Sequence, residues 1–186
     1  MLYRFLFCAL ILGWQIAFSQ TVDPTNVTII RDHFGVPHIF GKSDADAAYG
    51  LAYAHSEDNF VDMQEAILAG KGLLGSHLGK DGVLFDFGMK LLNIDSLVDA
   101  RFEKDLTSAY RNVLAGYAQG LNDYAAAHPK EILIKKAFPV SPKDLVKSST
   151  LSLSLMAGLG MALKAVNENR IEEFLGANEI ETGTGS

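Results

Sequence analysis

The residue types that most often do chemistry in proteins show no metal-binding or phosphate-binding pattern in this sequence. Its five histidines have neither HxxxH spacing nor a carboxylate at ligand spacing, so they predict no metal centre: His33, His38, His55, His77 and His128. We interpret His38 and His55 as structural. Residues 70–82 hold five glycines, but they lack the GxxxxGK(S/T) order of a phosphate-binding loop and follow a predicted helix rather than a strand.

Composition and charge exclude several classes of partner. The formal net charge is −6 at pH 7, without a basic run, so neither nucleic acid nor an anionic membrane is expected to attract the protein. The single cysteine, Cys8, lies in the apolar N-terminal segment, so we expect no disulfide and no cysteine-bound metal in the mature chain. With 186 residues and 48% hydrophobic content, the chain is long enough to form one domain with a substantial core.

The N-terminus has the composition of a secretory signal peptide. Arg4 supplies a positive charge, an apolar run extends from Phe5 to Phe18, and Ala17 and Ser19 provide the small residues that signal peptidase requires. We predict cleavage between Ser19 and Gln20, which gives a secreted or periplasmic protein with no membrane contact afterwards. An uncleaved membrane anchor is the alternative.

The elements that position any site begin with a hairpin and two helices. Val27–Ile30 is a β-branched strand, Arg31–Gly35 has the composition of a turn, and Val36–Phe40 predicts the returning strand. Ser43 is expected to cap the first helix, and Ser56–Asp58 is expected to start the second, where two acids suit the positive end of the helix dipole.

Capping residues and apolar spacing predict five more helices: residues 73–78, 96–102 with Asp95 or Ser96 as cap, 107–127, 142–163 after the cap Ser141, and an acidic helix that begins at Asn167 and gives way to the tail that starts at Glu181. In residues 107–127 the apolar side chains recur at i, i+3, i+4 and i+7, so we expect this aromatic stripe to be core. The apolar part of the fourth helix, Leu151–Leu163, is too short to span a bilayer. We interpret it as a buried helix packed against a sheet.

Three pieces of the sequence resemble the start of the α chain in the penicillin acylase family of N-terminal nucleophile (Ntn) hydrolases. They are Arg31–Ile39 (RDHFGVPHI), Tyr49–Ala54 (YGLAYA) and Glu57–Asn59 (EDN), and Gly116–Asn122 (GYAQGLN) is similar at the matching place. The first three together span about thirty residues in the family's order and spacing. The YGLAYA and EDN variants look closer to acyl-homoserine-lactone and aculeacin acylases than to penicillin G acylase.

The resemblance implies a fold class, a domain division and a partner. The expected fold class is α+β: a mostly helical segment with a short N-terminal β-hairpin, part of an αββα Ntn-hydrolase sandwich that a β chain completes. Residues 1–19 would be the signal peptide, residues 20–185 the acylase α chain, and residue 186 the start of a β chain that the sequence does not contain. The expected partners are that β chain, as the second chain of a heterodimer, and a small-molecule amide.

In the resembled family a Gly–Ser bond such as Gly185–Ser186 marks the autocatalytic cut, and the serine becomes the first residue of the β chain. The resemblance therefore implies that Ser186 is the nucleophile and that Gly185 and Ser186 form the processing site. A serine hydroxyl needs a base within hydrogen-bond reach, and the freed α-amino group, with a pKa of about 7.7–8, can be that base. Without the upstream pieces, the Gly/Thr/Ser tail would be interpreted as disordered.

The family also implies substrate and metal contacts. The helix corresponding to residues 151–163 helps wall the family's acyl pocket, so Met156 and Gly160 are candidate substrate-binding residues, with plain core packing as the alternative. A family calcium site takes one glutamate from the late α chain. Glu168 lies near that place, but a solvated acidic face is its alternative role. The metal content of the site is therefore left open. No cofactor is expected for the chemistry, and a structural calcium is an option only for the complete α/β protein.

The reaction implied by the resemblance is hydrolysis of a linear amide through an acyl-enzyme. N-acyl homoserine lactones or related fatty-acyl amides are the favoured substrates, and a penicillin-type β-lactam side-chain acylase is the first alternative. Two alternatives of another class are an inactive secreted helical fragment or binding partner, and a membrane-anchored interaction domain. The acyl chain, the leaving group and the oxyanion hole are not determined by this sequence.

Overall fold

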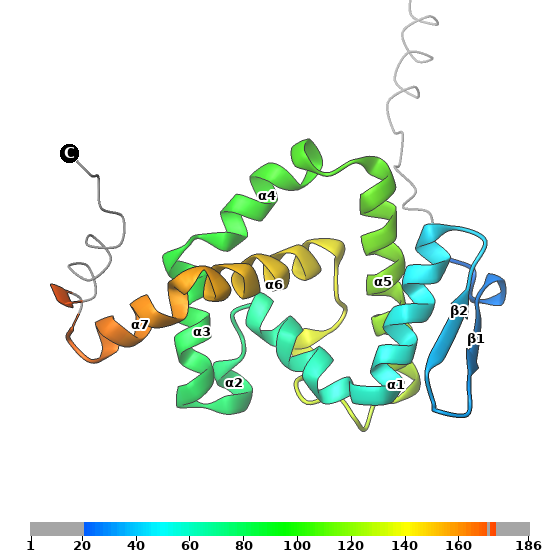
Figure 1. Cartoon of the computed structure of the whole chain (residues 1–186), viewed down its shortest axis with the longest axis horizontal. Coiled ribbons are helices and arrows are strands. Elements are labelled where there is room, and N and C mark those ends of the chain that lie inside the picture. The colour runs from blue at the N-terminus through cyan, green and yellow to red at the C-terminus, as the bar shows by residue number, and fades with distance from the viewer. Residues whose placement is uncertain (1–20, 171, 174–186) are drawn as a thin grey trace, which may run out of the picture.

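The computed structural model describes residues 21–170, 172 and 173, which are mostly helical with one β-hairpin at the N-terminal end (Figure 1). This agrees with the expected mixture of helices and a short hairpin. The elements are two 3-10 turns (Pro24–Asn26 and Lys135–Ala137), the strands β1 (Thr28–Arg31) and β2 (Pro37–Phe40), the helices α1 (Asp44–Gly70), α2 (Gly75–Leu78), α3 (Lys80–Leu91), α4 (Ile94–Asp105), α5 (Ser108–Ala127), α6 (Pro142–Ser154) and α7 (Gly160–Asn167), and a π turn, Leu155–Leu159.

The hairpin forms as the sequence predicts. Strands β1 and β2 pair antiparallel, with Ile29 opposite Ile39 and Ile30 opposite His38. The turn between them is closed by a hydrogen bond of 3.0 Å from the Gly35 N–H to the Asp32 carbonyl. Gly35 has φ +82°, a conformation that costs glycine little.

The hairpin lies directly on α1 because Gly50 has no side chain. A Cβ at Gly50 would be 2.6 Å from Ile39 Cγ2 and 2.8 Å from Val27 Cγ1. The close approach between the helix and the hairpin therefore depends on glycine at this position. Figure 1 shows the two strands beside the first half of α1.

Helix α1 begins as predicted, but its interruption lies three residues later than expected. Ser43 and Asp46 form a reciprocal capping box. The predicted second start at Ser56 is wrong, since Ser56 is buried and its hydroxyl donates to the Ala52 carbonyl at 2.8 Å. The break is at Asn59, with φ −157° and ψ 71°. Its side chain, as a short Asx residue, offers the next turn a local acceptor.

Helix α5 has the predicted limits, and glycines beside the predicted stripe make its closest approach to α1. A Cβ at Gly116 would be 2.2 Å from the Ala45 carbonyl oxygen, and one at Gly120 would be 2.4 Å from that of Tyr49. The two backbones therefore meet at glycines. The C-terminal part of the aromatic stripe is buried, whereas Tyr110 at its start is 51% exposed.

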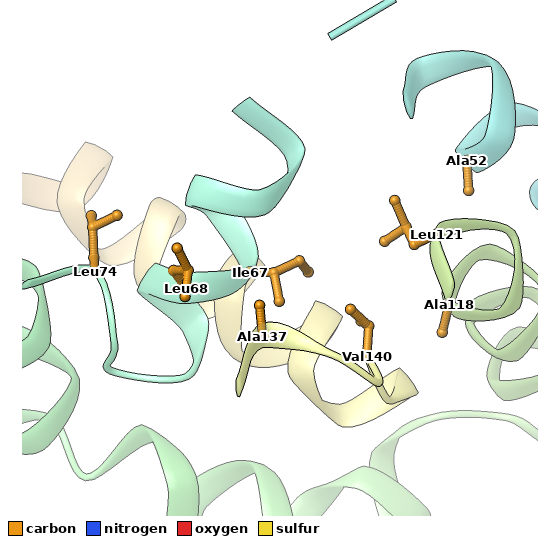
Figure 2. Close-up of a cluster of buried hydrophobic side chains, with 8 residues drawn as sticks. All are labelled: Ala52, Ile67, Leu68, Leu74, Ala118, Leu121, Ala137 and Val140. Carbon is orange, nitrogen blue, oxygen red and sulfur yellow. The ribbon is translucent and has the colours of Figure 1, made fainter. Parts of the chain in front are cut away.

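The main hydrophobic core lies where α1, α5 and the segment before α6 converge (Figure 2). Figure 2 shows side chains of α1 facing those of the 137–140 segment and of α5. Its buried members are Ala52, Ile67, Leu68, Leu74, Ala118, Leu121, Ala137 and Val140. Gln64 is fully buried beside this core and holds the loop after α5 by hydrogen bonds to the Glu131 carbonyl (3.0 Å) and from the Leu133 N–H (2.8 Å).

Helix α6 begins at the predicted cap, Ser141, but its surroundings differ from the prediction of a buried helix against a sheet. In the part of the chain that the structure describes, it packs on α1, α4 and α5. Gly70 at the end of α1 lets the Ser148 backbone approach, because a Cβ there would be 2.7 Å from Ser148 N. Much of the continuous segment Pro142–Asn167 is exposed, and by length and composition alone it is apolar enough to cross a membrane. Core helices and signal sequences pass the same test, so this observation is weak evidence for a span.

Two other helix limits also differ from the predictions. Helix α4 is preceded by Asn93 in the left-handed conformation (φ +50°), and neither Asp95 nor Ser96 caps it. Helix α7 ends at Asn167, so the expected acidic helix does not continue through 168–170. Residues 172 and 173 are helical again, and the rest of that prediction, like the signal peptide and its cleavage site, lies outside the described residues.

Candidate functional site

The pieces of sequence that carry the family resemblance meet at one side chain, Arg31. Its Nη2 is 2.9 Å from Glu57 Oε2 and 2.9 Å from Asp58 Oδ1. Its Nη1 donates to the Gly35 carbonyl at 2.9 Å and Nη2 to the Ala54 carbonyl at 3.4 Å. We call Arg31, Glu57 and Asp58 the Arg31 clamp. It joins the strand, the turn and the helix of the three motif pieces.

Electrostatics favours the charged form of Arg31 in the Arg31 clamp. The hydrogen bond with Glu57, and then that with Asp58, raises the pKa of the Arg31 guanidinium. The clamp is partly open to water, since the side chains of Glu57 and Asp58 are 41% and 52% exposed. Open ion pairs contribute little individually, so the bidentate geometry and the two carbonyl contacts give the clamp its specificity.

The next residue along the chain, Asp32, fixes the turn of the hairpin. Its Oδ1 accepts from the N–H groups of Phe34 (2.9 Å) and Val36 (3.0 Å), and Oδ2 lies 3.3 Å from His38 Nε2. Partial burial alone would raise the pKa of Asp32, but these hydrogen bonds outweigh it and lower the pKa. The structural interpretation of His38 therefore agrees with its contact.

A shallow groove of about 580 Å³ lies beside the clamp. Its lining combines the clamp with Gly35 and the rings of Tyr53, Tyr124 and His128. Tyr53 meets Tyr124 edge-on with ring centroids 5.3 Å apart, and His128 stacks on Tyr124 at 4.0 Å. These rings pack against one another, and none of the side chains that line the groove is an activated nucleophile. In the described structure, the residues that line the groove connect the hairpin, α1 and the end of α5.

Sequence reasoning missed the clamp. Glu57 and Asp58 were predicted to serve the dipole of a new helix, but the helix break follows them, at Asn59, and their carboxylates turn to Arg31 instead. A usable signal was present. Arg31 is the only arginine or lysine among residues 27–41, and two adjacent acids follow in the same motif block.

The candidate substrate residues Met156 and Gly160 lie at the π turn between α6 and α7. Gly158 within it has φ +103°. In the preceding turns the hydroxyls of Thr150 and Ser154 donate to backbone carbonyls four residues earlier at 2.8 Å, a contact that often accompanies helix bending. Met156 is 85% exposed, so this chain alone does not enclose it. A Cβ at Gly160 would have only Leu155 Cδ2, at 4.0 Å, for a neighbour. Both assignments, substrate contact and core packing, therefore stay predictions for Met156 and Gly160.

An apolar groove of about 320 Å³ lies on another face, between α1, α5 and α6. Met63, Val113, Leu114 and Tyr117 line it, so the predicted aromatic stripe borders this groove as well as the core. The Tyr117 hydroxyl lies 3.2 Å from His55 Nδ1, which gives His55 the structural contact expected for it. Burial raises the pKa of Tyr117, so its hydroxyl stays protonated at neutral pH.

The predicted nucleophile Ser186 and its neighbour Gly185 lie outside the described residues. Among residues 21–170, 172 and 173, no three His, Asp or Glu side chains gather as a metal-ligand set. Glu168 accepts a hydrogen bond of 3.0 Å from Arg170 Nε. That contact engages its carboxylate, so the described residues by themselves do not fit a calcium site.

Comparison with known proteins identifies the family to which this chain belongs. Residues 26–181 match the penicillin amidase family, and the chain is a member of it. It is 27% identical to penicillin G acylase of Escherichia coli over 135 residues, covering 70% of this chain and 16% of that protein. It is 29% identical to the acyl-homoserine lactone acylase PvdQ of Pseudomonas fluorescens over 174 residues, covering 87% of this chain and 22% of that protein.

Lengths and a solved structure add two facts. The chain spans about a fifth of the length of the curated relatives that it matches. One further relative is the penicillin acylase 2 proenzyme of a Pseudomonas species. It is 27% identical over 101 residues, which cover 54% of this chain and 13% of that protein. A thermostable penicillin G acylase from Alcaligenes faecalis has the same fold, with a TM-score of 0.55 at 21% identity. The similarity covers 86% of this chain and 92% of that one.

Proposed function

We propose that this chain is the α-chain portion of a secreted N-terminal-serine amidohydrolase, cut autocatalytically between Gly185 and Ser186. Membership of the penicillin amidase family over residues 26–181 carries the proposal. Two facts support the cut. One relative is named a proenzyme. In a solved acylase there is a separate chain of similar length, and this chain covers 92% of it. The curated relatives, in contrast, are several times longer than this chain. The β chain begins with Ser186 and supplies the remaining parts of the catalytic site.

The chemistry requires the cut to precede catalysis. In the uncut chain the Ser186 nitrogen is an amide and has no basicity. Once freed, it is an amine with a pKa of about 7.7–8 and accepts the hydroxyl proton at neutral pH. Ser186 Oγ then attacks the amide carbonyl of the substrate, the amine product leaves with a proton, and water hydrolyses the acyl-enzyme to release the acid.

The exposed π turn is the part of the described chain that suits an acyl group. Met156 presents a flexible apolar side chain, of a kind that fills irregular spaces, and the open surface at Gly160 leaves room beside it. We propose that this turn forms one wall of an acyl pocket whose other walls come from the β chain. N-acyl homoserine lactones or related fatty-acyl amides are the favoured substrates, since relatives named acyl-homoserine lactone acylase match most of this chain.

A β-lactam side-chain acylase is the second candidate, favoured by the similarity to penicillin G acylase. The two readings differ in the acyl group that the pocket accepts, a long alkyl chain or a compact aromatic one. A third candidate, of another class, is an inactive secreted helical fragment or binding partner. It requires that no β-chain sequence follow Ser186 in the gene.

The experiment that tests processing is intact-mass analysis of the protein expressed from the gene continued past Ser186. We expect two chains, one of which begins at Ser186, and a mature N-terminus at Gln20. A Ser186→Ala precursor is expected to stay whole, and Ser186→Cys to split, because a thiol also attacks the preceding carbonyl. A wild-type precursor that never splits would refute the proposal.

The substrate proposal is tested with the processed enzyme and a series of amides that differ in acyl length. Met156→Ala is expected to raise KM for long acyl chains by about tenfold, the effect of losing one to two buried methylene contacts. Met161→Ala is the matched control, because Met161 is the same residue type, 64% exposed and five residues away. Equal effects of both substitutions would remove Met156 from the acyl pocket.

A further inference from the structure

The start of the described chain is tied to α5 by a pair of hydrogen bonds. The Val22 N–H donates to Gln119 Oε1 at 2.8 Å, and Gln119 Nε2 donates to the Val22 carbonyl, also at 2.8 Å. The Val22 residue is buried, with 6% of its surface exposed. We call Val22 and Gln119 the Gln119 clamp. It satisfies both backbone groups of Val22 at once, as a neighbouring strand would.

The residues that follow the Gln119 clamp are also fixed. Asp23 caps the 3-10 turn Pro24–Asn26, since its carboxylate accepts from the Thr25 N–H at 3.0 Å and from the Thr25 hydroxyl at 2.8 Å. These hydrogen bonds lower the pKa of Asp23, so the acceptor is charged at neutral pH. Chain termini are usually poorly ordered unless they are tied down, and this chain is tied down from Val22 onward.

Only Gln20 and Thr21 would precede the Gln119 clamp in the mature protein. Cleavage between Ser19 and Gln20 makes Gln20 the first residue, and its freed α-amino group, with a pKa of about 7.7–8, is partly neutral and nucleophilic at neutral pH. In a terminal glutamine that amine and the side-chain amide can close a small lactam ring. Because the clamp begins at Val22 and Thr21 is exposed, ring closure at Gln20 requires no change in the described fold.

We propose that Gln20 is converted to pyroglutamate once the signal peptide is removed, so that a neutral lactam precedes the Gln119 clamp. The α-amine nitrogen attacks the Cδ carbon of its own side chain, the N–Cδ bond forms, and the bond from Cδ to the side-chain nitrogen breaks. That nitrogen takes the proton that the amine loses and leaves as ammonia, so no co-reactant is consumed. The inference rests on the proposed function only for the position of the mature N-terminus.

The lactam protects the contact that the Gln119 clamp makes. Aminopeptidases remove residues one at a time from a free α-amino group, and pyroglutamate has none. Trimming through Val22 would remove both hydrogen bonds of the clamp together with a buried side chain, and Gln119 would lose both partners. A blocked N-terminus therefore keeps α5 joined to the start of the chain where aminopeptidases are present.

Intact-mass analysis of the freshly isolated exported protein, expressed from the gene continued past Ser186, tests the modification. We expect the chain that begins at residue 20 to be lighter than its sequence by one molecule of ammonia. Pyroglutamyl peptidase is expected to remove that residue and leave Thr21 first. Gln20→Ala is the matched control and is expected to keep the mass of its sequence. A free Gln20, a different first residue, or a lactam that forms only during storage would overturn the inference.

Aminopeptidase treatment tests the link to the Gln119 clamp. Gln20→Ala is expected to be shortened through Val22 and then to unfold at a lower temperature, as Gln119→Leu does without trimming, whereas the wild type stays whole. Trimming that stops before Val22, or that leaves the unfolding temperature unchanged, would refute the protective role of the lactam.

The same mass spectra separate this inference from the proposed function, because they also report the cut at Gly185–Ser186. A protein that splits there but has a free Gln20 would overturn this inference alone. A protein that carries the lactam and never splits would leave this inference standing while processing fails.

Discussion

The contact between α1 and α5 predicts opposite effects for the same substitution at two helical glycines. Gly116 faces the α1 backbone, where an added Cβ would be 2.2 Å from the Ala45 carbonyl oxygen. Gly160 also has helical backbone angles, φ −59° and ψ −41°, but an added Cβ there would meet only one side-chain atom, at 4.0 Å. Gly116→Ala and Gly160→Ala therefore differ mainly in packing.

The magnitudes follow from two opposing effects. Replacing a glycine by alanine within a helix favours the folded state by about 1 kcal/mol, and Gly160→Ala is expected to gain that amount or slightly less. At Gly116 an ordinary carbon–oxygen contact of about 3.3 Å requires the two helices to separate by about 1 Å. Overpacking of this kind costs about 1–3 kcal/mol, and separation also weakens the contacts on either side of Gly116. We expect a net loss of about 1–2 kcal/mol.

The assay is thermal unfolding of the complete precursor, carrying Ser186→Ala so that all variants remain one chain. Gly116→Ala is expected to unfold at a lower temperature than the parent, and Gly160→Ala at the same or a higher temperature. Gly120→Ala, whose Cβ would be 2.4 Å from the Tyr49 carbonyl oxygen, is expected to behave like Gly116→Ala. If Gly116→Ala matched Gly160→Ala, the backbone approach of α1 and α5 would be refuted.

Three further perturbations test other parts of the structure. Gln64→Leu removes the partners of the Leu133 N–H and the Glu131 carbonyl, so it is expected to cost about 2–5 kcal/mol in chemical denaturation. An unchanged midpoint would contradict the role of the Gln64 hydrogen bonds. The hydrogen bond from Lys147 (2.7 Å) makes the largest contribution to lowering the pKa of Asp95. The ion pair therefore stabilises the folded state above pH 3.8, and this stabilisation is lost as the pH falls through the lower folded-state pKa of Asp95. Asp95→Asn is expected to weaken the pH dependence of the free energy of unfolding in that acid range. A pH dependence equal to that of the wild type would show that this ion pair does not contribute to stability. Arg31→Lys keeps the charge but cannot make the bidentate contacts, so hydrogen exchange in the hairpin should accelerate while exchange in α5 is unchanged.

Local rules predicted the local features of this fold. The hairpin, the cap at Ser43, the start of α5 at Thr107 and the start of α6 at Ser141 were all found where short-range chemistry placed them. Each depends on groups within about five residues of one another, so the sequence contains the whole cause.

The errors share a different origin, which is competition from distant groups. Ser56 has the type and place of a helix cap, but it is buried and donates to Ala52 instead. The acids after it were assigned to a helix dipole, but they bind Arg31, which is twenty-six positions from Glu57 and twenty-seven from Asp58. None of these choices is determined by spacing along the chain.

The Arg31 clamp also explains why a sequence motif can identify the family while leaving the substrate open. Arg31 is required for its several N–H donors. Gly35 is required for its left-handed backbone conformation, and Gly50 for the close approach of the hairpin. Few other residues could replace them. These constraints concern the scaffold and are the same for any acyl group. A residue such as Met156 makes no contact in this chain that requires methionine. Its type can therefore vary with the substrate, and only measured selectivity of the complete enzyme will assign the acyl group.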